Sequence, residues 1–140
     1  MGAVAKGGSS PLRAVLGYAE RVHARGLVFM DSPGYDPVSA TGQIAGGANL
    51  ICFTTGRGSC FGCAPTPSLK ISTTSELARR MPDDIDLDAG TILDGLETQD
   101  EVGERIFQML LDTASGRRTA SEVLGYGEDE FVPWTPGLTY

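Results

Sequence analysis

The chain has 140 residues, enough for one domain with an ordinary hydrophobic core. Its formal net charge of −7 argues against a nucleic-acid-binding surface, and three cysteines, an odd number, do not make a disulfide framework. No apolar run approaches the roughly 20 residues of a membrane span, and the N-terminus lacks the regions of a signal peptide. We therefore expect a cytoplasmic protein that binds neither nucleic acid nor membrane.

The N-terminal part is expected to hold a flexible lead-in, residues 1–9, followed by a helix and a strand. Ser10 can cap a helix whose first residue is Pro11, and apolar residues then recur at helical spacing as far as Gly26. The short apolar run 27–31 is typical of a strand buried on both faces.

The middle of the chain is expected to alternate helices and strands. Asp36 has the signature of an N-cap and opens a helix of small residues, and apolar runs at 49–55 and 68–72 predict two more strands. Residues 73–80 predict a short helix, and an acidic irregular segment follows at 81–95.

Two capping boxes mark helices in the C-terminal part. Thr98 with Glu101 begins a long amphipathic helix, and Thr119 with Glu122 begins a shorter one. Residues 126–140 carry two prolines and are expected to form an irregular tail. This order of elements predicts a single α/β domain over the whole chain. Its fold is expected to be three-layer and Rossmann-like, with a short, mostly parallel sheet flanked by helices.

Residues 53–70 form a loop rich in glycine, with two cysteines, two prolines and one arginine, between two predicted strands. The glycine pattern does not fit a dinucleotide-binding turn, because Pro65 and Pro67 stand where that motif needs a helix. No Lys-Ser or Lys-Thr pair completes a phosphate-binding P-loop either. Cys60 and Cys63 have the spacing of half a zinc site or of a redox pair, but a structural zinc needs about four ligands.

The interpretation that remains is an anion site. In open α/β sheets ligands bind at strand ends, where backbone N–H groups of a glycine-rich turn can converge on a negative group. The guanidinium fork of Arg57 matches a carboxylate, although a tight exposed turn explains Gly-Arg-Gly equally well. The predicted substrate-binding residues are Thr54, Thr55, Gly56, Arg57, Gly58 and Ser59.

Three motifs cover much of the chain: FMDSPGYDPVSATGQIAGGANLICFTTGRGSCFGCAPTPSLKIS, RMPDDIDLDAGTILDG and DEFVPW. They resemble the C-terminal region of the altronate and galactarate dehydratase family of sugar-acid dehydratases. The similarity extends over nearly the whole chain. Family members are several hundred residues long, so the chain resembles only their last portion.

The resemblance implies a lyase of hexuronate catabolism, within carbohydrate metabolism, that acts on altronate or, as the second choice, galactarate. Such enzymes use Fe²⁺ in most cases, with Mn²⁺ or another divalent metal as alternatives, and leave a 2-keto-3-deoxy acid. A base removes the proton next to the carboxylate, positive charge holds the resulting enediolate, and the β-hydroxyl leaves. The implied partners are a small sugar acid and the upstream domains of the same enzyme, and a homo-oligomer is an option.

The resemblance also suggests individual roles. Cys63 falls where the family pattern has a cysteine and is the expected metal ligand, whereas Cys60 stands at a variable position. Asp31, after the predicted strand, and Lys70, inside another, are the candidate catalytic residues. Asp31 could instead cap a turn, and the Lys70 side chain could extend along the sheet to solvent. The sequence holds one histidine, His23, so most metal ligands are expected upstream of this region.

A rival hypothesis is a non-catalytic sugar-acid-binding or assembly subunit that works with a separate catalytic chain. The reading frame upstream separates the two: an open frame through the start of this region favours a dehydratase fragment, and a stop codon favours a subunit.

Overall fold

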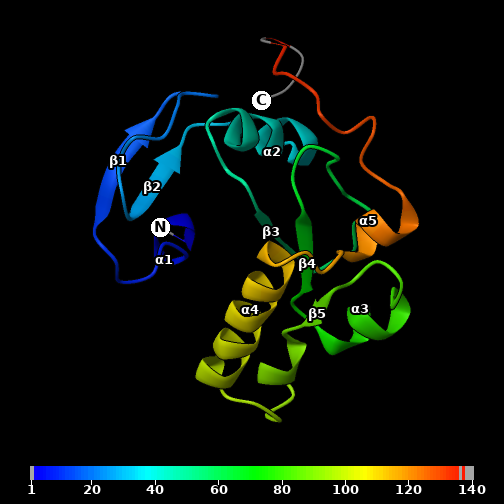
Figure 1. The fold of residues 1–140 in the computed structure, drawn as a ribbon. Coiled ribbons are helices and arrows are strands. Elements are labelled where there is room, and N and C mark those ends of the chain that lie inside the picture. Colours follow the sequence, from blue (N-terminus) through cyan, green and yellow to red (C-terminus); the bar gives the residue numbers. More distant parts are fainter. Residues whose placement is uncertain (1, 136, 138–140) are drawn as a thin grey trace.

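The computed structural model describes residues 2–135 and 137 (Figure 1). In chain order the elements are α1 (Gly2–Ala5), β1 (Leu12–Leu16), β2 (Leu27–Met30), α2 (Asp36–Ala45), β3 (Ile51–Thr55), β4 (Ser68–Ser72), α3 (Ser75–Arg80), β5 (Leu87–Asp88), the 3-10 helix η1 (Gly90–Ile92), α4 (Gln99–Ala114) and α5 (Ala120–Leu124). None of these helices has the length and apolar composition needed to cross a bilayer.

The strands form two parallel sheets. β1 pairs with β2, and β4 lies between β3 and β5 in the second sheet. The α/β class and the parallel pairing are therefore confirmed, but the strands divide between two sheets and do not form one.

Residues 12–16 form β1, so the predicted helix from Ser10 to Gly26 is wrong. The register of β1 shifts between Leu12 and Ala14, where β1 carries one extra residue relative to β2. Leu12 and Val15, three residues apart, therefore both pair with positions on one face of β2. An i, i+3 apolar spacing that is usually helical arises here from a bulged strand.

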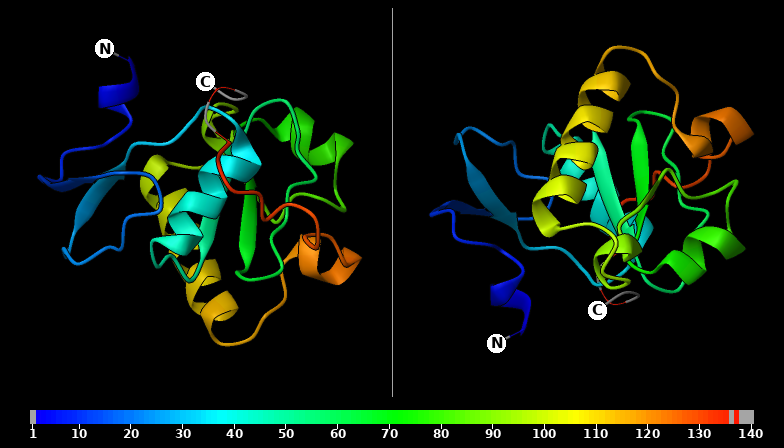
Figure 2. Two further views of the ribbon diagram at one scale, coloured as in Figure 1. Left: turned by 90° about the horizontal axis from the view of Figure 1, so that it is seen from above. Right: turned by 90° about the horizontal axis from the view of Figure 1, so that it is seen from below.

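Helices cover both faces of the three-stranded sheet (Figure 2). On one face Ile71 and Leu87 pack against Val102 of α4. On the other face Ala40 of α2 packs against Phe61. This layering of helix, sheet and helix agrees with the predicted three-layer fold.

Residues 56–67, which we call the crossover loop, join β3 to β4 without a helix. Because the two strands are parallel, the loop must pass from the carboxyl edge of the sheet to its amino edge. The ring of Phe61 stacks on that of Phe53, with centroids 5.3 Å apart. At the amino edge the Ile51 N–H donates to the carbonyl of Pro67.

Local capping signals place two helices correctly. Thr98 and Glu101 form the predicted box, in which each side chain accepts from the other residue's N–H, and Thr119 and Glu122 repeat it. These hydrogen bonds from Thr98 hold the pKa of the Glu101 carboxyl below its usual value. Asp36, by contrast, is the first residue of α2 and not its N-cap, which is Tyr35.

The acidic segment 81–95 contains β5 and η1 and is less irregular than predicted. Asp86 joins two elements, because its carboxylate accepts from the N–H of Lys70 in β4 and from that of Ala120 in α5, both at 2.7 Å. Asp86 therefore belongs to the scaffold and does not form part of a solvated loop.

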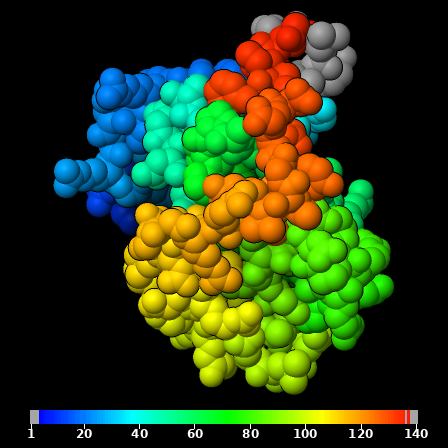
Figure 3. Space-filling view, turned by 45° about the vertical axis from the view of Figure 1, so that its right-hand side comes forward, coloured from blue at the N-terminus to red at the C-terminus, as the bar shows by residue number. Residues whose placement is uncertain are grey.

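The described N-terminal and C-terminal segments lie on the surface. α1 lies within the lead-in that was predicted to be flexible, and Met1 lies outside the described residues. Residues 126–135 and 137 of the tail contain neither helix nor strand, and the other tail residues are not described. The tail crosses the surface in Figure 3 and contacts α2, where the Val132 N–H donates to Thr41.

Candidate functional site

The predicted substrate-binding residues 54–59 lie at the carboxyl edge of the β3–β4–β5 sheet. Parallel strands place all their carboxyl ends at one edge, so the chain that follows each strand gathers there. Thr73 after β4 donates its N–H to the carbonyl of Thr55 at 3.0 Å. Gly90 after β5 lies against α3, since a Cβ on it would be 2.0 Å from the Ser75 nitrogen.

Contacts with neighbouring residues hold the Gly-Arg-Gly turn in place. The Thr55 hydroxyl accepts from the N–H of Gly58 at 3.1 Å, so it holds the turn. Gly58 has φ +110°, and a Cβ on it would be 2.5 Å from the Met81 sulfur, so only glycine fits. Ser59 accepts from the Phe61 N–H at 3.0 Å. The hydroxyls of Thr55 and Ser59 therefore shape the turn.

Arg57 leaves its side chain exposed at this edge while its backbone is held. The Arg57 carbonyl accepts from the Arg80 guanidinium at 2.8 Å, whereas the Arg57 guanidinium has no hydrogen-bond or ion-pair partner among the described residues. Arg80 thus adds a second positive charge at the same edge. Arg80 was not among the predicted site residues, although the basic pair Arg79–Arg80 at the end of a helix that follows a strand was a signal for it.

Lys70 is fully buried in the middle of β4, with 0% of its surface exposed. Its ammonium donates to the carbonyl of Phe61 at 2.9 Å. Desolvation lowers the pKa of Lys70, against the opposing effect of nearby acidic groups, of which Asp86 is the strongest. Lys70 lies beneath the crossover loop and fastens it to the sheet.

Cys63 is also buried, in a cluster with Ala40 and Phe61. Burial, and to a lesser extent the negative charge of Glu130, raise the pKa of the Cys63 thiol and so disfavour the thiolate that binds metals. Cys60 is exposed. Over residues 2–135 and 137, no three His, Cys, Asp or Glu side chains come close enough to share a metal ion. The described residues therefore do not form a metal site by themselves.

We call the carboxyl edge that carries Arg57 and Arg80 the arginine edge. Asp31 lies apart from it, at the end of the other sheet. It directly follows β2, is exposed, and donates its N–H to the carbonyl of Leu16 at 2.9 Å. The structure therefore places residues 54–59 at one edge, Lys70 beneath the crossover loop and Cys63 within that loop, and leaves Asp31 at the end of the β1–β2 sheet.

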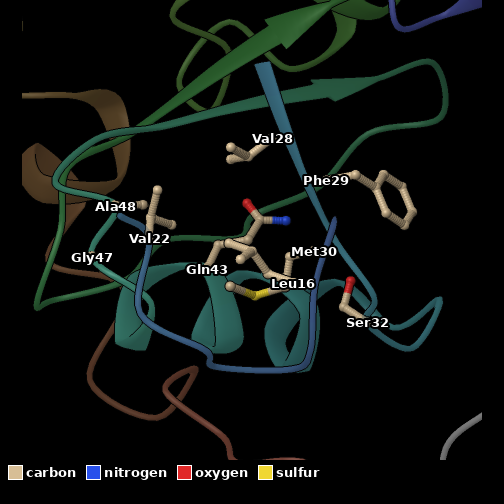
Figure 4. A pocket seen from close by; sticks show the side chains of 9 residues that line it. All are labelled: Leu16, Val22, Val28, Phe29, Met30, Ser32, Gln43, Gly47 and Ala48. Carbon is tan, nitrogen blue, oxygen red and sulfur yellow. The ribbon is translucent and has the colours of Figure 1, made fainter. Parts of the chain in front are cut away.

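A cavity of about 510 Å³ lies between the β1–β2 sheet and α2 (Figure 4). Gln43 projects into it from α2, while the ring of Phe29 points away. Ser32 is the other polar side chain with a hydrogen-bonding group in its lining, and its hydroxyl already bonds that of Ser39 at 2.9 Å. The mostly apolar lining does not suit a polyhydroxy acid, which favours the arginine edge as the candidate site.

Known proteins match the chain along most of its length. Residues 1–139 match the family described as D-galactarate/Altronate dehydratase, C-terminal. Galactarate dehydratase (L-threo-forming) from Escherichia coli is 42% identical over 118 residues, which are 84% of this chain and 23% of that protein. Altronate dehydratase from the same species is 34% identical over 87% of this chain and 24% of its own length.

A third relative is the (2R)-sulfolactate sulfo-lyase subunit beta of Chromohalobacter salexigens, 35% identical over 81% of this chain and 29% of its own length. The chain thus spans about a quarter of the length of the curated relatives that it matches. The chain belongs to the D-galactarate/altronate dehydratase family and corresponds to its C-terminal region.

Proposed function

We propose that this chain is the carboxylate-holding region of a hydro-lyase that dehydrates a sugar acid to a 2-keto-3-deoxy acid. Altronate is the first expected substrate and galactarate the second. Both names come from relatives, which are galactarate and altronate dehydratases.

The observation that carries the proposal is the exposed guanidinium of Arg57 at the carboxyl edge of a parallel sheet. The Arg57 backbone is held by the Arg80 guanidinium and by the hydrogen bond between Thr55 and Gly58. The Cα position of Arg57 is therefore fixed at this edge. A planar fork can bind both oxygens of a carboxylate, and a fixed cation can also stabilise charge that grows on that carboxylate during proton removal. Arg80 adds positive charge beside it.

The other candidate residues then take different roles. Lys70 is a positioning residue, because its ammonium reaches the carbonyl of Phe61 and holds the crossover loop. Asp31 stays a candidate acid or base, since its carboxylate is exposed at a strand end, but it would act only if the complete enzyme brings the substrate to both Asp31 and Arg57. A divalent metal, and the residues that bind it, would belong to the part of the enzyme outside this region.

The test is a dehydratase assay of the complete gene product over a panel of hexonates and hexarates, with ferrous iron added. The product is a 2-keto acid, which carbonyl reagents detect. We expect turnover of altronate or galactarate. A folded sample that forms no keto-deoxy acid from any member of the panel would contradict the proposal.

The second candidate function is a non-catalytic sugar-acid-binding or assembly subunit. The likeness to a sulfo-lyase subunit favours its premise, an enzyme made of two chains. In that case the complete gene product would bind a sugar acid without consuming it, and activity would appear only after a separate lyase chain is added. Calorimetry with altronate, run beside the assay, distinguishes binding from turnover.

A further inference from the structure

The β1–β2 sheet carries one uncovered apolar face. Strand register places Leu12 opposite Leu27 and Val15 opposite Phe29, so these four side chains share a face that we call the outer face. Their exposed fractions are 54%, 37%, 64% and 58% in that order. The opposite face, with Leu16 and Met30, lines the cavity against α2.

This one-sided cover is unusual for parallel strands. Parallel sheets occur almost only where both faces are buried, because their strands are apolar on both sides. The outer face is also hollowed: Val4 of α1 joins Leu12, Leu27 and Phe29 in lining a largely apolar cavity of about 450 Å³. A flat face would suit many neighbours, whereas a cavity of this kind accepts an inserted apolar side chain.

The length of the relatives indicates which segment could cover the outer face. Galactarate dehydratase of Escherichia coli matches this chain over 23% of its length, and the family match is to the C-terminal region, so most of such a polypeptide precedes this region. That polypeptide would enter at α1, and Val4 of α1 lines the same cavity as the outer face.

We propose that the outer face is the docking surface for the preceding segment of a full-length dehydratase polypeptide, which inserts an apolar side chain into the cavity between α1, β1 and β2. The docked segment buries the four side chains and completes the missing layer over the β1–β2 sheet. This inference rests on family membership and not on the identity of the substrate.

Hydroxyl-radical footprinting of the complete gene product tests the proposal. Phe29 and Phe107 are matched reporters, since they have the same ring and are 58% and 52% exposed in this chain. We expect Phe29 to be oxidised roughly fivefold more slowly than the rate its exposure predicts, because the core of a protein interface is desolvated. Phe107, on α4, sets the rate for a ring of this exposure.

Two variants localise the effect. Val15→Glu places a carboxylate on the outer face and should return Phe29 to the rate expected from its exposure, whereas Val15→Thr keeps the shape and should preserve most of the protection. Val123→Glu is the matched control, since Val123 is 65% exposed on α5 and Val15 is 64% exposed. It should leave Phe29 protected.

Three results would overturn the proposal. Phe29 could react at the rate that its exposure predicts, the protection could survive Val15→Glu, or it could disappear on dilution. Loss on dilution would identify a second copy of the protein as the occupant. None of these readouts depends on turnover, so an inactive but folded enzyme tests the surface as well as an active one, and failure of the dehydratase assay stays a separate result.

Discussion

Arg57 and Arg80 lie at one edge of the sheet but use their side chains differently. The Arg80 guanidinium is engaged by the backbone of Arg57, whereas that of Arg57 points to solvent. This asymmetry means that Arg80 shapes the turn, and it leaves the Arg57 side chain available for the ligand that we propose.

Arg57→Lys should therefore damage catalysis but not folding. An ammonium is a point charge that cannot reproduce the planar fork, so we expect kcat/KM of the complete enzyme to fall about 100-fold, or about 3 kcal/mol of transition-state stabilisation. The measurement is steady-state kinetics beside a thermal unfolding curve that should not change. Arg79→Lys, at an exposed position in the last turn of α3, is the control and should keep wild-type kinetics. Wild-type kinetics in Arg57→Lys would make Arg57 a turn residue only.

The burial of Lys70 makes the stability of the protein depend on pH. Because desolvation lowers its pKa in the folded protein from the usual 10.5, the unfolded chain binds more protons between the two values, and stability rises as pH rises through that window. Lys70→Met removes this rise and also the hydrogen bond to Phe61, which costs about 1 kcal/mol.

The prediction concerns the difference in free energy of unfolding between Lys70→Met and wild type. We expect this difference to favour methionine most at neutral pH and to move toward wild type as pH approaches 10.5, as measured by urea unfolding. Lys6→Met, at an exposed lysine, should show no such trend. A difference that does not change with pH would mean that the charge of Lys70 is not desolvated.

At the scale of elements, the turn after β5 and the middle of α4 give a matched pair of glycines. A Cβ on Gly90 would overlap the backbone of Thr74 and Ser75, at 2.3 and 2.0 Å, whereas a Cβ on Gly103 meets nothing. We expect Gly90→Ala to destabilise the chain by about 2 kcal/mol or more. Gly103→Ala should stabilise it by about 0.5–1 kcal/mol, since glycine is a poor helix former. Equal melting temperatures for the two variants would show that the turn after β5 can move to accommodate a Cβ without a loss of stability.

The elements that the sequence predicted correctly depend on neighbours along the chain. The Thr98–Glu101 and Thr119–Glu122 boxes span four residues each, so the pattern alone reveals them. β1 was mistaken for a helix because its bulge becomes visible only once its pairing with β2 is known.

In the candidate site, too, features set by sequence neighbours were predicted and contacts between distant residues were not. The strand-glycine pattern predicted where residues 54–59 lie, at a strand end of a parallel sheet. It did not reveal that Lys70 is buried beneath the crossover loop or that Arg80 reaches Arg57, 23 residues away, because both contacts form only when β3, β4 and α3 have come together.

At the scale of the whole molecule, the described residues form a buried core but do not form a metal site by themselves. α4 and the β3–β4–β5 sheet share a buried cluster built from Ile71, Leu87 and Val102. The described residues, however, bring no three metal-binding side chains together. These two properties predict different outcomes for folding and for catalysis.

We expect this 140-residue chain, purified alone, to unfold cooperatively and to form no keto-deoxy acid from altronate or galactarate when ferrous iron is added. The measurements are thermal unfolding and a carbonyl assay of the product. Arg57→Lys serves as the contamination control, because a host enzyme would be indifferent to it. Iron-dependent turnover that falls in Arg57→Lys would contradict this division of labour.

The crossover loop also bears on how such enzymes diverge. It is held at Gly58 by Thr55 and at Phe61 by Lys70, and Ser59 and Cys60 lie between these two points. Selection for a new acid can then alter these two residues, or lengthen the loop between the two points, without disturbing β4. We expect enzymes of this family that prefer different sugar acids to vary between the two attachment points and to share the buried strand beneath them.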